Sequence, residues 1–235
     1  MFRKLAMAAV AVSVLATAGS AAATTDLLTN GDFEDGLAPD QFGSGLNAYS
    51  RGIPTGWLQM PGRDNVDTIE DGYSQGGPPF QVLQGAQSGT HFLDMNGFYS
   101  NGGIYQDVTG IADGAALTLS LWSTQWVQNT INGRITYNIR DLSGGHALLA
   151  TGTVYVAGTP WTLSTLNAVA NSSGGVRIEL LGDTDYQAGP GLDNVSLTAR
   201  GGGVVPEPAT WGLMIAGFGG IGAMLRRRRP TQALA

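Results

Sequence analysis

The chain has 235 residues and no cysteine, and its 12 lysines and arginines against 18 acidic residues give a formal net charge of −6. Without cysteine it has no disulfide framework, no cysteine zinc ligand and no thiol nucleophile. Half of the basic residues lie near the two ends, so residues 24–200 keep six arginines, no lysine and seventeen acids, a net of −11. A surface this acidic repels nucleic acid and anionic lipid, and it is compatible with divalent cations or neutral polymers.

The first 23 residues have the pattern of a secretory signal peptide. Arg3 and Lys4 precede an apolar stretch over residues 5–18, and Ala21 and Ala23 form a small-residue cleavage site. A segment of this kind directs export and is then removed. About 180 residues remain once both ends of the chain are removed, which is enough for one domain with a substantial core.

Within residues 24–200, apolar and polar residues alternate in the period of half-buried β-strands. The clearest alternation covers residues 117–121, 135–139, 176–180 and 195–197, and shorter candidates lie at 80–83, 91–95, 104–108, 147–156 and 161–169. Residues 35–77 are richer in turn residues and predict a long loop with one strand at 57–60. No apolar period of 3.6 residues occurs between the two ends. The pattern predicts an all-β sandwich with a core between two antiparallel sheets.

Several short motifs follow one another in an order that resembles a known class of domain. They are Asn-Gly-Asp-Phe-Glu at 30–34, Gly-Trp at 56–57, Gly-Thr-His-Phe-Leu at 89–93, Gly-Ile-Tyr-Gln at 103–106, Leu-Thr-Leu-Ser-Leu-Trp at 117–122 and Leu-Asp-Asn-Val-Ser-Leu at 192–197. This order is similar to that of the carbohydrate-binding-module jelly rolls of the galactose-binding-like type. The resemblance implies glycan binding on a sheet face or a loop edge, a structural Ca²⁺ in many members, and no catalysis.

The same resemblance implies a position for calcium, because in these families the ion joins the N-terminal segment to the last strand. The matching positions are Asp32, Glu34 and Asp193. Calcium takes six to eight hard oxygen ligands, and carboxylates are common among them. The alternative is that Glu34 and Asp193 only cap turns. Asp183 and Asp185 form a second acidic pair, but they lack the ligand spacing of an EF-hand loop and indicate a solvated turn.

Two tryptophans are the candidate glycan-binding residues. On the strand predicted from residue 116 to 127, leucines at 117, 119 and 121 take the inward positions, which places Trp122 and Trp126 on the polar face. Indole rings on such a face stack against sugar rings while neighbouring polar groups bond the hydroxyls. The alternative is that Trp122 packs beneath loops and that Trp126 lies beyond the end of the strand.

Catalysis has little support in the sequence. The two histidines, His91 and His146, are far apart, and no His-Glu-x-x-His motif occurs. Gly-Tyr-Ser-Gln-Gly at 72–76 fits Gly-x-Ser-x-Gly, but a serine hydrolase needs that motif at a strand-to-helix turn, and no helical period follows it. A polysaccharide hydrolase would need two facing carboxylates, and no spacing singles out such a pair. We therefore expect a protein that is not an enzyme.

The tail has three parts after a glycine-rich linker at residues 201–205. A Pro-Glu-Pro-x-x-Trp motif leads into an uncharged run at 211–225, which a basic cluster follows; the residues are Pro206, Glu207, Pro208 and Trp211, then Arg226, Arg227, Arg228 and Arg229. The run is a marginal membrane helix, and the arginines keep its end and the short tail 230–235 in the cytoplasm. The prolines hold the entering segment extended.

This order over residues 206–229 resembles the PEP-CTERM sorting signal of Gram-negative bacteria. The resemblance implies export through the inner membrane, transient anchoring by the helix, and processing by an exosortase at the tail. The expected destination is the cell surface or an exopolysaccharide matrix. We therefore expect a noncatalytic exopolysaccharide-binding protein, with a structural biofilm-matrix protein without lectin activity as the close alternative and a polysaccharide hydrolase as the distant one.

Overall fold

The computed structural model describes residues 25–35, 41–42, 49–73, 84–96, 101–126, 133–143, 145–158, 160–171, 174–184 and 189–201. The predicted signal peptide, the sorting motif and the membrane helix at 211–225 lie outside these residues. Among the described residues, no helix is long and apolar enough to cross a membrane.

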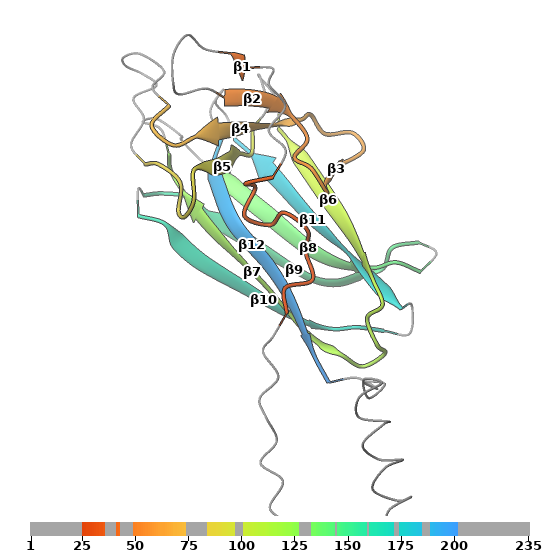
Figure 1. The fold of residues 1–235 in the computed structure, drawn as a ribbon. Helices are drawn as coiled ribbons and strands as arrows, with labels where there is room; N and C mark the ends of the chain where they lie inside the picture. The colour runs from red at the N-terminus through yellow and green to blue at the C-terminus, as the bar shows by residue number, and fades with distance from the viewer. Residues whose placement is uncertain are drawn as a thin grey trace, which may run out of the picture.

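The described residues form two antiparallel β-sheets and no helix, as the alternation predicts (Figure 1). The strands are β1 (Gln41–Phe42), β2 (Tyr49–Gly52), β3 (Leu58–Gln59), β4 (Val66–Glu70), β5 (His91–Asp94), β6 (Gly103–Thr109), β7 (Ala116–Thr124), β8 (Arg134–Asp141), β9 (Leu148–Tyr155), β10 (Thr162–Val169), β11 (Gly175–Asp183) and β12 (Gly191–Arg200). One sheet has seven strands in the order β1-β2-β4-β5-β12-β7-β10, and the other has five in the order β3-β6-β11-β8-β9.

The main core lies between the two sheets and is built by the predicted alternation. On β7, Leu117, Leu119 and Leu121 are at most 1% exposed, and on β11 Ile178 and Leu180 are fully buried. Successive strand residues point to opposite faces, so the residues between these positions form the outer faces of the sandwich. Burial of this apolar surface is the main stabilising term for a protein without disulfides.

The region predicted as a long loop contains three strands of the seven-stranded sheet, β1, β2 and β4, besides the predicted strand near 57–60. Four consecutive residues of β4 are buried, because Val66 packs in the main core while Ile69 packs in a second apolar cluster on the outer face. A strand that is buried on both faces shows no alternation. This is why the sequence pattern missed it. The candidate strand at 80–83 lies outside the described residues.

The N-terminal segment, residues 25–35, runs along the last strand, β12 (Figure 1). Two backbone hydrogen bonds join them in an antiparallel sense, from the Leu27 N–H to the Leu197 carbonyl and from the Val195 N–H to the Gly31 carbonyl, both 2.8 Å long. One Asp26 carboxylate oxygen also accepts the Leu197 N–H at 3.0 Å. The segment therefore occupies the side of β12 that the short strand β5 leaves unpaired, since β5 pairs with only Gly191 and Leu192.

The close approach of this segment to β12 requires glycine at position 31. A Cβ atom built on Gly31 would lie 2.0 Å from the Val195 carbonyl oxygen, far inside van der Waals contact. We expect Gly31→Ala to push the segment away from β12 and to lower the free energy of unfolding by about 2–4 kcal/mol, because overpacking adds to a lost hydrogen bond. Thermal or denaturant unfolding measures the change.

The matched control is Gly158→Ala. A Cβ atom there would meet its nearest neighbour, a Pro160 ring carbon, at an ordinary 3.7 Å. This variant should unfold like the wild type. Equal stability of the Gly31→Ala and Gly158→Ala proteins would show that the N-terminal segment does not hold the position described.

Candidate functional site

The motif at residues 30–34 forms a tight turn that begins with Asn30. The Asn30 side chain is 8% exposed. Its Oδ1 accepts the Asp35 N–H at 2.9 Å, and its Nδ2 donates to the Asp35 and Thr55 carbonyls at 3.0 and 2.9 Å. Its own carbonyl accepts the Trp57 indole N–H at 3.0 Å. Asn30 adopts a left-handed conformation, φ 51°, which asparagine tolerates better than most residues. This residue therefore organises the turn.

Phe33 decides where the two acids on either side of it point. Its ring is 1% exposed and packs on Trp57 with the ring centroids 5.9 Å apart. Phe33 also has a left-handed φ of 58°. In an extended strand, Asp32 and Glu34 would lie on the same face. The left-handed residue between them breaks that relation. Asp32 is consequently exposed, while Glu34 turns toward another part of the chain.

Glu34 fastens the start of β5. Its Oε1 accepts the main-chain N–H groups of Thr90 at 2.7 Å and His91 at 2.8 Å, and its Oε2 accepts the Thr90 hydroxyl at 2.8 Å and lies 2.9 Å from His91 Nδ1. Burial opposes ionisation of the carboxyl, but the hydrogen bonds from His91 and Thr90 outweigh it, so the pKa of Glu34 lies below its ordinary value.

Asp193 fastens the same loop from the side of β12. It is fully buried. Its Oδ2 accepts the N–H groups of Gln87 at 2.8 Å and Ser88 at 3.3 Å, and its Oδ1 accepts the Asn194 N–H at 2.7 Å. Burial raises the pKa of Asp193 to about 6, against the hydrogen bonds, and the negative charge of Glu34 adds to the rise. Asp193 and Glu34 are thus near one another and act on one loop.

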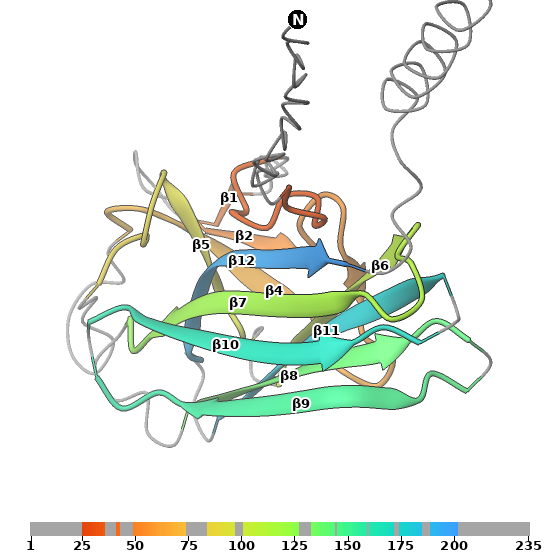
Figure 2. The ribbon, with the colours of Figure 1, turned by 90° about the horizontal axis from the view of Figure 1, so that it is seen from below.

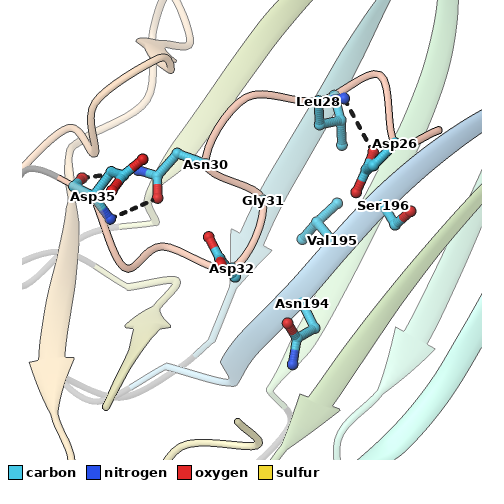
Figure 3. A pocket seen from close by; sticks show the side chains of 9 residues that line it. All are labelled: Asp26, Leu28, Asn30, Gly31, Asp32, Asp35, Asn194, Val195 and Ser196. Carbon is cyan, nitrogen blue, oxygen red and sulfur yellow. Dashed lines mark hydrogen bonds between the residues drawn. The ribbon is translucent and has the colours of Figure 1, made fainter. Parts of the chain in front are cut away.

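The third predicted calcium ligand, Asp32, is not with these two. It lines a pocket of about 440 Å³ between the N-terminal segment and β12 (Figure 3). The pocket is lined by Asp26, Leu28, Asn30, Gly31, Asp32, Asp35, Asn194, Val195 and Ser196, so neither Glu34 nor Asp193 reaches it. Among the residues that the structure describes, no group of three or more histidine and acidic side chains is placed to hold a metal ion. The predicted three-carboxylate set is therefore not assembled, and calcium binding stays a prediction that rests on Glu34 and Asp193.

The predicted pair of glycan-stacking tryptophans is also not formed. Trp122 lies on the outer face of the seven-stranded sheet as predicted, half-buried and opposite Leu163 of β10. Trp126 is only 2% exposed. Its ring packs on Phe92, with centroids 5.6 Å apart, and on Tyr73 at 6.4 Å. The prediction for Trp126 was wrong because β7 ends at Thr124 and the chain then turns the ring into the second apolar cluster.

The outer face of the five-stranded sheet holds a set of polar side chains that the sequence reading did not single out. Four of the six arginines of the domain gather there or at its rim, each paired with an acid. The pairs are Arg63 and Arg134 with Asp183 at 2.7 and 3.1 Å, Arg140 with Glu179 at 2.7 Å, and Arg177 with Asp107 at 2.7 Å. Their guanidinium groups are therefore held in fixed orientations.

Two tyrosines complete this surface, which we call the arginine–tyrosine face: Tyr105, Tyr155 and the four arginines with their acid partners. The Tyr155 ring is 70% exposed and lies opposite Arg134. The Tyr105 ring is half-buried, and the Arg177 guanidinium covers it at 3.9 Å. Only Tyr155 therefore offers an open ring. In the sequence, polar residues at alternate positions of 134–140, and at 177, 179 and 183, indicate an exposed strand face. The ion pairs themselves join residues of different strands, so the sequence alone does not predict them.

Glu179 is the most buried acid of the arginine–tyrosine face. It is 3% exposed, and its Oε2 accepts hydrogen bonds from Asn138 Nδ2 at 2.9 Å and Arg140 Nε at 2.7 Å. A buried carboxylate with two donors is fixed in position and fixes those donors in turn. The remaining N–H groups of Arg140 point away from this bond, and one donates to the His146 carbonyl at 3.1 Å. The face is thus a preorganised set of donors and acceptors.

Asp67 and Asp94 form a pair of facing carboxyls, which is the arrangement that a glycoside hydrolase would need. Asp67 of β4 lies opposite Asp94 of β5, and they are 8% and 3% exposed. Burial raises the pKa of Asp94 well above its usual range, and the nearby Asp67 adds to the rise. The N–H groups of Asn96 and Gly189 donate to Asp94 Oδ1 at 2.9 and 2.7 Å. Because both carboxyls are buried under neighbouring residues, this pair does not present the open acid and base of a glycoside hydrolase.

Comparison with known proteins identifies the tail. A family model described as the PEP-CTERM protein-sorting motif matches residues 204–229. The sequence prediction for residues 206–229 is thereby confirmed: the chain carries a PEP-CTERM sorting motif. None of the curated proteins matches the chain.

The β-sandwich is similar to several solved carbohydrate-binding modules. These include TmCBM61 in complex with β-1,4-galactotriose, at 14% identity and a TM-score of 0.48 over 75% of this chain and all of that one. The tandem CBM22-1–CBM22-2 domain of Paenibacillus barcinonensis Xyn10C is 16% identical, with a TM-score of 0.48 over 82% of this chain and 50% of that one. A CBM4 structure is 15% identical, with a TM-score of 0.38 over 74% of this chain and 99% of that one.

The placement of Glu34 and Asp193 makes the calcium prediction specific. We expect millimolar Ca²⁺ at pH 7.5 to raise the melting temperature relative to EDTA, by the equivalent of about 2.7 kcal/mol when calcium is a hundredfold above its dissociation constant. The increment should fall as the pH drops through about 6, because protonated Asp193 does not bind the ion.

Two variants separate the ligands in this experiment. Asp193→Ala should abolish the calcium increment and also lower the calcium-free melting temperature, because three N–H groups lose their acceptor. Asp32→Ala should leave the increment unchanged, because Asp32 lies in the separate pocket. Identical wild-type melting temperatures in EDTA and in calcium would mean that Glu34 and Asp193 only fasten the loop.

Proposed function

We propose that this is an exported, exosortase-processed protein that binds an extracellular polysaccharide on the arginine–tyrosine face and catalyses no reaction. The observation that carries the proposal is the exposed Tyr155 ring beside arginines held in fixed orientations by buried or half-buried acids. An open aromatic ring packs against the C–H face of a sugar, and preorganised donors bond its hydroxyls. The sorting motif indicates export, which would bring the protein to an extracellular polysaccharide.

The charge distribution supports the choice of this face over the rest of the domain. Residues 24–200 have a net charge of −11, yet the arginine–tyrosine face holds four arginines against three acids, Asp107, Glu179 and Asp183. Repulsion of acidic sugars is therefore weakest here. Neutral and uronic-acid polysaccharides are both compatible with a face of this charge, and nucleic acid is disfavoured by the field of the whole domain.

Two alternatives to glycan binding on the arginine–tyrosine face have some support. Trp122 remains a candidate for sugar stacking on the opposite sheet, since its ring lies on the outer face near the exposed Leu163. A structural matrix protein without lectin activity would use the same sorting motif and the same stable sandwich. A hydrolase has less support, because the paired carboxyls Asp67 and Asp94 are buried.

The processing route is tested by the mass of the exported protein. In a host that carries its exosortase, intact-mass measurement should show a chain that begins just after Ala23 and has lost the arginines at 226–229. Removal follows from the signal peptide pattern and from the sorting motif. A surface protein that retains the four arginines would contradict exosortase processing. The same protein from a strain without exosortase, which should keep its tail, is the control.

The binding proposal is tested with single substitutions on the two outer faces. The wild type should bind polysaccharide on a glycan array and in depletion assays without releasing reducing sugars. Tyr155→Ala should weaken binding about tenfold, which corresponds to about 1.4 kcal/mol, because the only open ring of the face is lost. Val169→Ala, an apolar truncation of similar exposure on the other sheet, is the matched control and should bind normally.

The other outcomes of the binding experiment distinguish the remaining hypotheses. Loss of binding in Trp122→Ala but not in Tyr155→Ala would move the site to the seven-stranded sheet. Absence of binding to any glycan, in a protein that melts cooperatively, would favour the structural matrix protein. Release of sugars would overturn the noncatalytic assignment.

A further inference from the structure

The four edges of the two sheets are of very different lengths. The strands β1 and β3, each at one end of its sheet, have only two residues each. The opposite edges are β9 in the five-stranded sheet and β10 in the seven-stranded sheet, with eight residues each. An edge strand leaves a row of backbone N–H and C=O groups without a partner in its sheet, and a long edge leaves more of them. Within the part of the chain that the structure describes, the β9 and β10 edges are therefore the long edges able to pair with another strand.

These two strands lie on the same side of the sandwich. In Figure 2, β9 and β10 are at the same margin of the molecule, one in each sheet, and residues of the two strands are in contact. We call this margin, β9 and β10 together, the uncharged edge. A second molecule that approached it would meet both sheets at once.

The chain that forms the uncharged edge carries no charged side chain. Residues 147–176 contain no Asp, Glu, Lys, Arg or His, although the rest of the domain carries seventeen acids and six arginines. Neither strand contains proline. Proteins protect long edge strands from pairing with charged side chains, prolines or covering segments, and lysine is the most frequent of these devices. The charge and proline devices are absent from β9 and β10.

The exposed apolar side chains of the domain gather on the same two strands. Among the described residues, five large hydrophobic side chains are exposed, and four of them lie on the uncharged edge. They are Leu148 and Tyr155 at the ends of β9, 47% and 70% exposed, and Leu163 and Val169 near the ends of β10, 49% and 62% exposed. Leu148 and Tyr155 lie on the outer face of the five-stranded sheet, and Leu163 and Val169 lie on the outer face of the seven-stranded sheet, so they flank the edge on both sides.

We propose that the uncharged edge pairs with the same edge of a second copy of this chain. The charge distribution favours contact at this margin. Because the domain has a net charge of −11, two copies repel each other where acids are exposed, and this repulsion is least at the margin that carries no charge. A twofold axis brings identical strands together antiparallel, which is the sense that every strand pair of both sheets already uses. The pairing joins the five-stranded sheets of two molecules through β9, with the β10 strands alongside.

The pairing uses the main chain of β9, and Tyr155 is the one residue that it shares with the arginine–tyrosine face. It places the two copies of that face in one continuous surface, since the outer face of β9 continues that of β8. Failure of either proposal leaves the other intact.

The absence of cysteine makes the test direct, since each single-cysteine variant of the full chain has one thiol. Thr151→Cys and Thr153→Cys place it on the exposed side of β9, and Thr165→Cys places it on β10. Thr109→Cys, also exposed but on the interior strand β6, is the matched control. A disulfide needs Cα atoms within about 7 Å, so only residues near the twofold axis cross-link.

In the exporting host under mild oxidation, we expect disulfide-linked dimers from at least one of the two β9 variants and none above background from Thr109→Cys. Adding Thr153→Lys to Thr151→Cys should abolish the dimer, because like charges would face each other across the axis. The single variant Thr153→Lys should melt like the wild type, which shows that the loss does not come from unfolding.

Two results would overturn the proposal. Equal cross-linking at position 109 and on β9 would mean that the copies associate elsewhere, for example through the apolar tail. No cross-linking at any position of β9 or β10, in folded protein, would mean that the uncharged edge stays unpaired.

Discussion

The antiparallel contact between the N-terminal segment and β12 is the constraint on which the rest of the described structure depends. It brings the first and last parts of the domain together through the Gly31 and Leu197 carbonyls and through the Asp26 carboxylate. Such a closure carries an entropy penalty that grows with the length of chain between the ends. Here the penalty is offset by main-chain hydrogen bonds, by the burial of Phe33 and by the loop that Glu34 and Asp193 hold in place. The Asn-Gly-Asp-Phe-Glu motif is thus explained by folding.

The sequence was most informative where one face of a strand is buried and the other is wet. The leucines of β7 and the aliphatic residues of β8 and β11 alternate for this reason, and their strands were predicted correctly. β4 was missed because both of its faces are buried. Trp126 was misplaced because side chains alternate between the two faces only within a strand, and β7 ends at Thr124. The separation of Asp32 from Glu34 depends on one left-handed residue, Phe33, for which sequence patterns have no signal.

Charge is distributed over this domain in three regions that serve different roles. Buried or half-buried acids such as Glu34, Asp193 and Glu179 accept hydrogen bonds and fix loops or arginines. Arginines gather on one outer sheet face, where their acid partners hold them in place. The margin formed by β9 and β10 has no charge at all. Four of the six arginines of the domain are therefore concentrated on one sheet face, where acids hold their N–H donors in place. The margin of β9 and β10 carries no charge, so it lacks the repulsion that two acidic copies of the domain exert on each other elsewhere.

The position of β12 determines how the domain responds to a pull on its tail. Because the N-terminal segment runs antiparallel to β12, residues 25 and 201 lie at the same end of the sandwich, and the sorting motif continues from there. β12 is an interior strand between β7 on one side and β5 with the N-terminal segment on the other. A force along the tail therefore shears two rows of hydrogen bonds together instead of peeling them one at a time from an edge. Forced unfolding is governed by the unfolding rate, so this arrangement favours a domain that stays folded under a load applied along β12.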